Sequence, residues 1–367
     1  MTPDEIVLKI MTWPYVKTFI PLFLLLIGFE WYWSVRKQKS WYRVNDAMSS
    51  LSCGIFSQLT NIVFRSASLF LYVYFFEKYS IYDFTHISWQ GKVVVMVLVF
   101  LACDLAYYWF HRYAHEINLG WAGHVVHHQS EEYNFTTALR QSSTQWIFSN
   151  FFHLPLAIVG IPIEWQLGMM GINVVYQFFI HTRAVGRFHP WIEWIFNTPS
   201  HHRVHHARNP KYLDRNYAGT LIIWDRIFGT FQVEEEEPVY GIVNPLKTFN
   251  PFKAQVYYYV VLWQDMLAAP HWMDKLKLWF KQPGWRPQGL TPYPQPPELD
   301  RATAIKFDPS THHKWLAMIL FLVGLAAAVP VLFMPGAATT KLVPIMFVLF
   351  VLSLAGMFSS GMVFRRR

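Results

Sequence analysis

The sequence predicts an all-α protein, a multi-pass integral membrane bundle of helices. Of its 367 residues, 53% are hydrophobic and 18% are aromatic. Charged residues make up only 15% of the chain, well below the roughly 25% that is typical of a soluble domain. Six apolar runs approach or exceed the roughly 20 residues that a helix needs to span a bilayer. They cover about residues 18–34, 50–76, 92–110, 147–180, 315–335 and 341–363.

The fourth apolar run differs from the others because it is long enough for more than one pass. Gly160, Pro162 and Glu164 interrupt it near its middle. Proline cannot donate a helical hydrogen bond, and broken helices are tolerated in a membrane only where protein surrounds them. We therefore predict a helical hairpin over 147–180 that crosses the bilayer completely or in part.

Basic residues indicate how the bundle is oriented. Lysines and arginines follow the first run and close the chain, at Arg36, Lys37, Lys39, Arg43, Arg365, Arg366 and Arg367. Because such residues favour the cytoplasmic side, the third and fourth runs are expected to end there. The first run lacks an evident cleavage site and is expected to remain as an anchor. The net charge of +8 then favours anionic lipid head groups as partners, and not nucleic acid.

We predict four segments in the chain. They are an N-terminal transmembrane helical pair at 1–91, a central unit at 92–260, an amphipathic and proline-rich linker at 261–313, and a C-terminal transmembrane helical pair at 314–367. The prolines of the linker favour extended geometry. Cys53 and Cys103 both lie in apolar runs, which argues against disulfide bonds and cysteine-based metal sites.

Eight histidines of the central unit form three clusters with metal-binding spacing. The clusters are HxxxH at His111 and His115, HxxHH at His124, His127 and His128, and HxxHH at His202, His205 and His206. Residues three and four apart share one face of a helix, so each cluster can direct several imidazoles to one point. Eight nitrogens exceed the ligands of one ion, which predicts a di-metal site on the cytoplasmic side.

Two further residues are candidates for the same site. Asp104 lies seven residues before His111, on the same helical stripe, and a carboxylate within a membrane helix is costly. Because ligating histidines commonly donate their free N–H to a carboxylate, we expect Asp104 to orient one of them. His181 ends the fourth run at the level of the clusters, and it is a candidate ninth ligand.

Two other classes of metalloprotein fit the pattern less well. A zinc protease needs the HExxH arrangement, which the sequence lacks. A metal transporter places its ligands near the middle of the membrane, whereas these histidines follow the ends of apolar runs.

The motifs resemble those of the fatty acid hydroxylase and sterol desaturase superfamily of membrane di-iron oxygenases. The sequence around these motifs is similar to that of the alkylglycerol monooxygenase branch over about residues 100–252. The similar stretches are DLAYYWFHRYAHEINLGWAGHVVHHQSEEYNFTTALRQS, then QFFIHT, then NTPSHHRVHHARNPKYLDRNYAGTLIIWDRIFGTF and VYGIVNPLKTFNP.

The resemblance implies that the eight clustered histidines hold two irons. It also implies that Glu116, which directly follows the first cluster, is a ligand or a proton carrier. The expected activity uses O2 and tetrahydrobiopterin to hydroxylate the ether-bearing carbon of an alkylglycerol, giving a fatty aldehyde and a glycerol derivative. A redox metal is needed because no side chain cleaves an unactivated C–H bond.

Alternatives to ether cleavage remain open at this stage. Within the superfamily, the alternative is a sterol or fatty-acid hydroxylase or desaturase, fed by a redox partner if pterin is not used. In a different class, the chain is a non-catalytic membrane protein with structural zinc. The expected membrane is the endoplasmic reticulum in a eukaryote and the cytoplasmic membrane in a bacterium.

Overall fold

The computed structural model describes residues 1–293, 304, 306–307, 314–333, 345, 348–349, 351–352 and 355–356, without the side chains of 62–68, 314 and 332–333. Within these residues the secondary structure is helical, which confirms that the fold is all-α, as predicted. A single antiparallel bridge, between Ala207 and Tyr240, is the one β-type pairing in this part of the chain.

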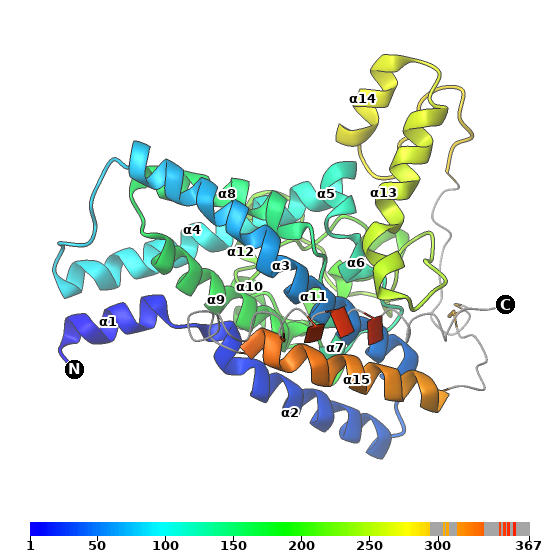
Figure 1. Cartoon of the computed structure of the whole chain (residues 1–367), viewed down its shortest axis with the longest axis horizontal. Coiled ribbons are helices and arrows are strands. Elements are labelled where there is room, and N and C mark those ends of the chain that lie inside the picture. The colour runs from blue at the N-terminus through cyan, green and yellow to red at the C-terminus, as the bar shows by residue number, and fades with distance from the viewer. Residues whose placement is uncertain are drawn as a thin grey trace.

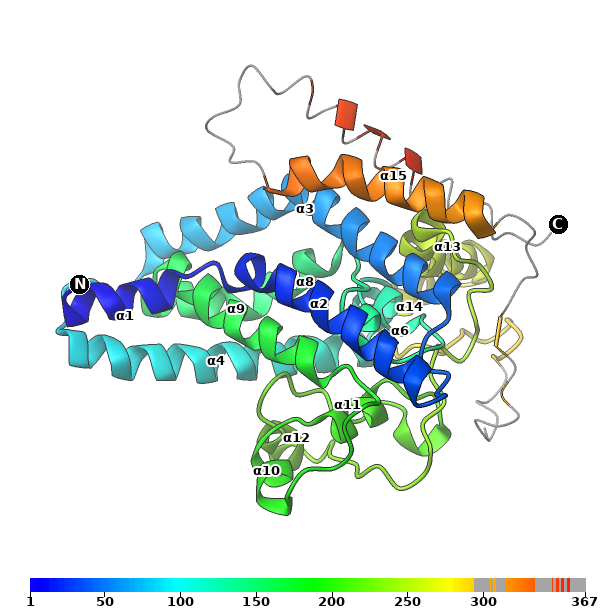
Figure 2. The same ribbon diagram turned by 90° about the horizontal axis from the view of Figure 1, so that it is seen from below.

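Long helices run roughly along the longest axis of the molecule (Figures 1 and 2). They are α1 (Pro3–Thr12), α2 (Tyr15–Arg36), α3 (Val44–Tyr79), α4 (Trp89–Glu116), α8 (Gln145–Val159) and α9 (Ile163–Ile180), with α15 (Lys314–Phe333) beside α3. Because α4 and α9 pack against each other, the chain segments that follow them come together at one end of the bundle.

Short helices surround that end of the bundle. They are α5 (Asn118–Ala122), α6 (Val125–His128), α7 (Phe135–Ala138), α10 (Pro190–Ile195), α11 (Pro199–His205), the 3-10 turn η1 (Pro210–Tyr212) and α12 (Ile223–Ile227). Two further helices, α13 (Pro251–Ala268) and α14 (Trp272–Phe280), stand out from the bundle beside α5 (Figure 1). Helix α13 runs through the boundary at residue 260 that the sequence led us to expect.

The fourth apolar run forms the predicted helical hairpin. Helix α8 ends at Val159, Gly160 adopts a left-handed conformation with φ of 105°, and α9 begins after Pro162. A Cβ atom at Gly160 would lie 1.8 Å from the carbonyl oxygen of Tyr82. Glycine is therefore required both by the backbone angle and by the close approach of the loop after α3.

Helix α1 packs onto α4 and α9, although the sequence analysis assigned no helix there. Thr2 and Glu5 form a capping box at its start, and Met11 is buried against Cys103 and Met169. Val7 and Met11 are its buried residues, and its 10 residues are too few for a membrane-spanning run.

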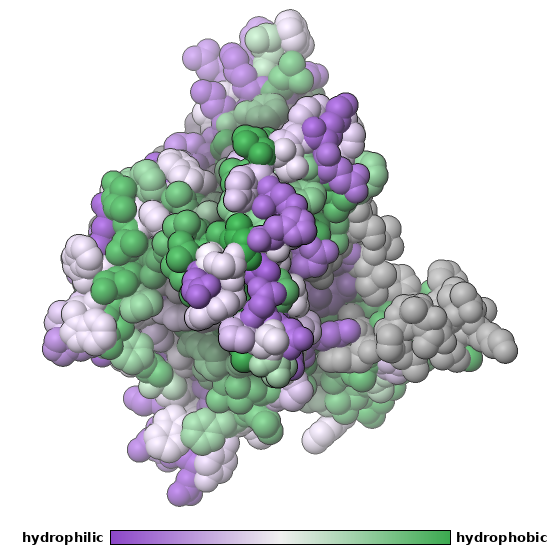
Figure 3. All heavy atoms as spheres, turned by 90° about the vertical axis from the view of Figure 1, so that its left-hand side faces the viewer, coloured by the Kyte–Doolittle hydropathy of each residue, from purple (hydrophilic) through white to green (hydrophobic). Residues whose placement is uncertain are grey.

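Two helices of the described chain, α2 and α4, are long and apolar enough to cross a membrane. The apolar part of α15, Trp315–Val331, is shorter, and most of the predicted sixth run lies outside the described residues. Seen from the end that holds α1, the sides of the molecule carry broad hydrophobic areas, while hydrophilic residues gather at the near end (Figure 3). This distribution suits a bundle with apolar surroundings along its flanks.

Candidate metal centre

Nine histidines meet where α4 and α9 end. The last turns of α4 carry His111 and His115, α6 and the residue before it carry three more, His181 caps α9, and α11 with its C-cap supplies the last three. Each of the nine side chains is at least nine-tenths buried. The structure thus brings together all the histidines singled out in the sequence, including His181.

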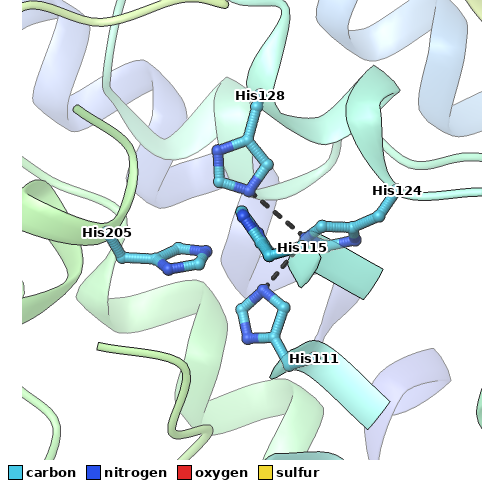
Figure 4. Close-up of side chains that lie close together, drawn as sticks. All are labelled: His111, His115, His124, His128 and His205. Carbon is cyan, nitrogen blue, oxygen red and sulfur yellow. Dashed lines mark hydrogen bonds between the residues drawn. The ribbon is translucent and has the colours of Figure 1, made fainter. Parts of the chain in front are cut away.

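Five of the histidines form the first group, which is shown in Figure 4. One nitrogen from each lies within 4.8 Å of the others, in the set His111, His115, His124, His128 and His205. The Nε2 atom of His124 lies 2.9 Å from Nε2 of His111 and 3.2 Å from Nε2 of His128. Their rings point toward a common centre from three different segments of the chain (Figure 4).

The other four histidines form the second group, again with one nitrogen each within 4.8 Å, in the set His127, His181, His202 and His206. Nε2 of His181 lies 3.2 Å from Nε2 of His127 and 3.1 Å from Nε2 of His202. The two groups adjoin, because the rings of His128 and His206 stack at 4.3 Å between centroids. The arrangement is therefore two neighbouring candidate sites with five and four nitrogens.

Hydrogen bonds on the outer nitrogens set the tautomers of several rings. Four Nδ1 atoms face backbone carbonyl oxygens at 2.6 to 3.0 Å, those of His111, His127, His181 and His205. A carbonyl oxygen only accepts, so each Nδ1 must carry the proton. Each Nε2 then offers a lone pair to the centre, as a metal ligand requires.

Burial keeps the imidazoles neutral. It lowers the pKa of His124 and of His181 to about 4. Burial, aided by repulsion from neighbouring histidines, also lowers the pKa values of five more histidines well below the ordinary value, those of His127, His128, His202, His205 and His206. Neutral imidazole is the form that ligates metals.

Several inward nitrogens lack a hydrogen-bond partner among the described residues. They include the buried Nε2 atoms of His115, His205 and His206. A buried polar atom without a partner is costly, and here the unpartnered atoms converge with other lone pairs. The histidines present therefore fit metal ions that bind imidazole, and the absence of cysteine from both groups suits iron or zinc held by nitrogen.

Asp104 was expected to orient one of the ligating histidines, but among the described residues it makes no hydrogen bond to a histidine of the centre. Its buried carboxylate accepts hydrogen bonds from the backbone N–H of Thr220 at 2.8 Å and of Leu221 at 3.0 Å, from Trp224 Nε1 at 2.9 Å, and from the Asn173 amide. Asp104 thereby holds the segment that follows Tyr217, whose carbonyl oxygen fixes His111. Its influence on the centre passes through that segment.

Glu116 lies outside both groups of histidines. Its carboxylate pairs with Arg112 at 2.9 Å, and about a third of the side chain is exposed. The carboxylate found beside a histidine of the centre is instead Asp214, which lies 3.8 Å from Nδ1 of His115. The Asp214 side chain is 60% exposed, so this carboxylate lies at the solvent edge of the first histidine group.

Other neighbours of the centre were missed by the sequence analysis. The Gln145 side-chain oxygen accepts from Nδ1 of His124 at 2.9 Å, and Tyr133 stacks on His181 at 5.6 Å. Neither residue shows a spacing relative to the clusters that could have revealed it. The four bonds to backbone carbonyls leave no sequence signal at all, because any residue can supply a carbonyl.

A buried ionic cluster lies next to Tyr133. The carboxylate of Glu132, 1% exposed, contacts Arg43 at 2.8 Å, Arg183 at 2.9 Å and Lys306 at 2.5 Å. These cations come from the start of α3, the loop after α9 and the segment before α15. The cluster joins distant parts of the chain beside the second histidine group.

The fold and the site together define an all-helical protein with an apolar bundle and a buried, histidine-only centre suited to two metal ions. Comparison with known proteins identifies a family that matches part of the chain. Residues 96–230 match the fatty acid hydroxylase family model. This region is similar to fatty acid hydroxylase domains, and the chain is a relative of the alkylglycerol monooxygenases.

The relatives were found among curated proteins. The chain is 46% identical to the alkylglycerol monooxygenase of Xenopus tropicalis over 272 residues, which are 74% of this chain and 58% of that protein. It is 44% identical to the human protein of the same name over 274 residues, 74% of this chain and 60% of that one. The chain thus spans about three-fifths of the length of these relatives.

A more distant relative is an ornithine lipid hydroxylase from Rhizobium tropici. It is 28% identical over 137 residues, which cover 37% of this chain and 41% of that protein. No solved structure matches the chain.

Proposed function

We propose that this protein is a membrane di-iron monooxygenase that hydroxylates the ether-bearing carbon of alkylglycerols. The product collapses to a fatty aldehyde and a glycerol derivative. The observation that carries the proposal is the pair of adjoining groups of buried, neutral histidines within a domain whose relatives are alkylglycerol monooxygenases.

Each group of histidines would hold one iron. The five-nitrogen group and the four-nitrogen group would bind through the nitrogens that face inward, His181 included. Bound iron would supply the redox chemistry with O2 that C–H hydroxylation requires. The protein's own contribution is to hold nine rings in place through backbone carbonyls, Gln145 and neighbouring rings, and to exclude water from the centre.

The lipid chain would reach this centre from the membrane. Helices α2 and α4 meet the criteria for membrane crossing, and α4 carries His111 and His115 in its last turns. We infer a multi-pass protein with the centre at the cytoplasmic edge, in the endoplasmic reticulum or in a bacterial cytoplasmic membrane. The alkyl chain would stay among helices while the polar head lies toward water, and residues 92–260 would form the catalytic unit.

The electron donor is inferred from the resemblance over residues 100–252, which favours tetrahydrobiopterin with O2 as co-substrate. A protein redox partner is the alternative. Glu116 is placed as a proton carrier at the rim, because it is partly exposed and adjoins His115. Asp104 is assigned a positioning role through the segment that follows Tyr217.

A second candidate function is hydroxylation of another lipid, such as a sterol or a fatty acid, without cleavage. The similarity to an ornithine lipid hydroxylase favours it. A third reading, of a different class, is a non-catalytic membrane protein with structural zinc, since zinc also binds buried imidazoles.

The experiment that tests the proposal measures fatty aldehyde released from a 1-O-alkylglycerol by membranes containing the protein. It is run under O2, with and without tetrahydrobiopterin, and with membranes lacking the protein as control. Pterin-dependent aldehyde is expected. An intact hydroxylated lipid would favour the second candidate, and no product from iron-loaded protein would argue against both.

A further inference from the structure

Helix α14 exposes an apolar stripe on the side that faces away from the protein. Trp272, Met273, Leu276 and Phe280 are 68%, 45%, 56% and 64% exposed. At 3.6 residues per turn, these four positions fall within an arc of about 100°. Leu278, which lies opposite, is buried against α5 and α13. One face of α14 therefore holds the helix to the protein, and the other is left uncovered.

Lysines border this apolar stripe on both sides. Lys275 lies beyond one edge and Lys277 beyond the other, and Lys281 follows at the C-terminal end. The acidic residue of the helix, Asp274, lies off the stripe, where it pairs with Lys277 at 3.4 Å. An apolar face flanked by lysines is the pattern of a helix that lies in the plane of a membrane surface.

The position of α14 relative to α4 supplies an independent argument. Asn118 lies two residues after the end of α4. Its backbone N–H donates to the carbonyl oxygen of Lys281 at 2.8 Å, and its side-chain amide donates to that of Leu278 at 2.8 Å. The C-terminal end of α14 is thus fastened where a helix able to cross a membrane ends. From there α14 stands out to the side of the bundle (Figure 1).

We propose that the apolar stripe of α14 docks on the anionic surface of the bilayer that α4 crosses. Trp272 and its apolar neighbours enter the boundary between head groups and acyl chains, where tryptophan is favoured. Lys275, Lys277 and Lys281 extend to lipid phosphates and carboxylates. The proposal rests on the membrane location inferred above and is independent of the reaction.

The test uses the full chain in proteoliposomes with one added cysteine. Both native cysteines, Cys53 and Cys103, are buried, so a polarity-sensitive fluorophore at Leu276→Cys is selective. Two labelled positions serve as controls. Val97→Cys on α4, where Val97 is 50% exposed, is the control for contact with lipid. Glu235→Cys, where the Glu235 side chain is 59% exposed, is the control for contact with water. Quenching is measured with brominated phosphatidylcholine, brominated phosphatidylserine and aqueous iodide.

We expect the label at Leu276 to be quenched by both brominated lipids, more strongly by phosphatidylserine, and several-fold less by iodide than the label at Glu235. Replacing Lys275, Lys277 and Lys281 with glutamine should abolish the preference for phosphatidylserine, whereas Lys211→Gln should leave it unchanged. Equal iodide quenching at Leu276 and Glu235 would overturn the proposal.

Three other outcomes would also overturn it. A label at Leu276 that neither lipid nor iodide reaches would indicate a protein partner, such as a second copy of the chain. If the label at Val97 also escapes the brominated lipids, the membrane location itself fails. If Val97 is quenched by lipid and Leu276 is not, only the docking of α14 fails.

Discussion

The two nitrogens of a histidine ring in the centre have different roles: one forms a hydrogen bond outward, and the other faces the centre. In His111, His127, His181 and His205 the Nδ1 atom donates to a carbonyl oxygen, so Nε2 keeps its lone pair. These bonds both orient the ring and choose the tautomer. The readiness of the centre to bind metal therefore depends on backbone positions as much as on the histidines themselves.

Replacing a histidine from either group should abolish activity. His205→Ala removes a nitrogen from the first group and His127→Ala removes one from the second. We expect more than about a 100-fold loss in aldehyde formation, because even changes in the partners of ligands cost 10- to 100-fold. His86→Ala is the matched control, since the His86 side chain is 89% exposed.

Wild-type turnover in His127→Ala or His205→Ala, with normal amounts of protein in the membrane, would contradict the assignment. A loss of activity in His86→Ala of similar size would show that the assay responds to histidine removal in general.

Asp104→Asn should destabilise the protein and lower activity indirectly. The carboxylate accepts from Thr220, Leu221 and Trp224, and an amide would turn an N–H toward one of these donors. A buried donor without a partner costs about 1–3 kcal/mol. Thermal unfolding in detergent should therefore show a lower midpoint. An unchanged midpoint with reduced activity would instead assign Asp104 a direct part in the reaction.

The sequence predicted the metal centre better than its surroundings. The spacing of the three clusters identified histidines that the fold brings together, and the level of His181 at the end of an apolar run singled it out. Asp104 was placed correctly on the stripe of His111, yet its partners are Asn173 on α9 and three groups within residues 220–224. These hydrogen bonds depend on how the segment around α12 packs against α4, and the spacing of residues along the sequence does not predict that packing.

At the scale of elements, the turn between α8 and α9 depends on one residue. Gly160 combines a φ of 105° with a close approach to the Tyr82 carbonyl oxygen. Proline and glycine in an apolar run gave a local signal, so this hairpin was predictable from sequence. Helix α1 was not predictable from the sequence, because it is held by packing on α9, where Gly168 meets the backbone of Met11.

Gly160→Ala should destabilise the protein by more than about 1–2 kcal/mol, the cost of the left-handed conformation alone. The added Cβ would also collide with Tyr82. Gly28→Ala is the control, because a Cβ there meets nothing within 4 Å. Alanine within a helix is favoured by about 1 kcal/mol, so this variant should unfold at the same or a higher temperature. Equal midpoints for both variants would contradict the account of the turn.

At the scale of the whole molecule, the Glu132 cluster joins three distant segments. Its carboxylate contacts Arg43, Arg183 and Lys306, which lie 89, 51 and 174 residues away. No spacing of residues in the sequence predicted this ionic cluster. It holds the loop that carries Tyr133 against the second histidine group.

Glu132→Gln should destabilise the protein by about 3–5 kcal/mol, because it leaves the buried guanidinium of Arg183 without its carboxylate partner. A clear drop in the unfolding midpoint is expected. The matched change Glu235→Gln, at a side chain that is 59% exposed, should have little effect. Similar midpoints for the two variants would show that the cluster contributes little to stability.

The nine histidines are proposed to hold two irons, a number that the iron-to-protein ratio of purified, iron-replete protein measures. We expect two irons per wild-type chain and fewer in His205→Ala and His202→Ala, each of which alters a different group. Two zinc ions per chain in place of iron, or an iron content unchanged in both variants, would contradict it.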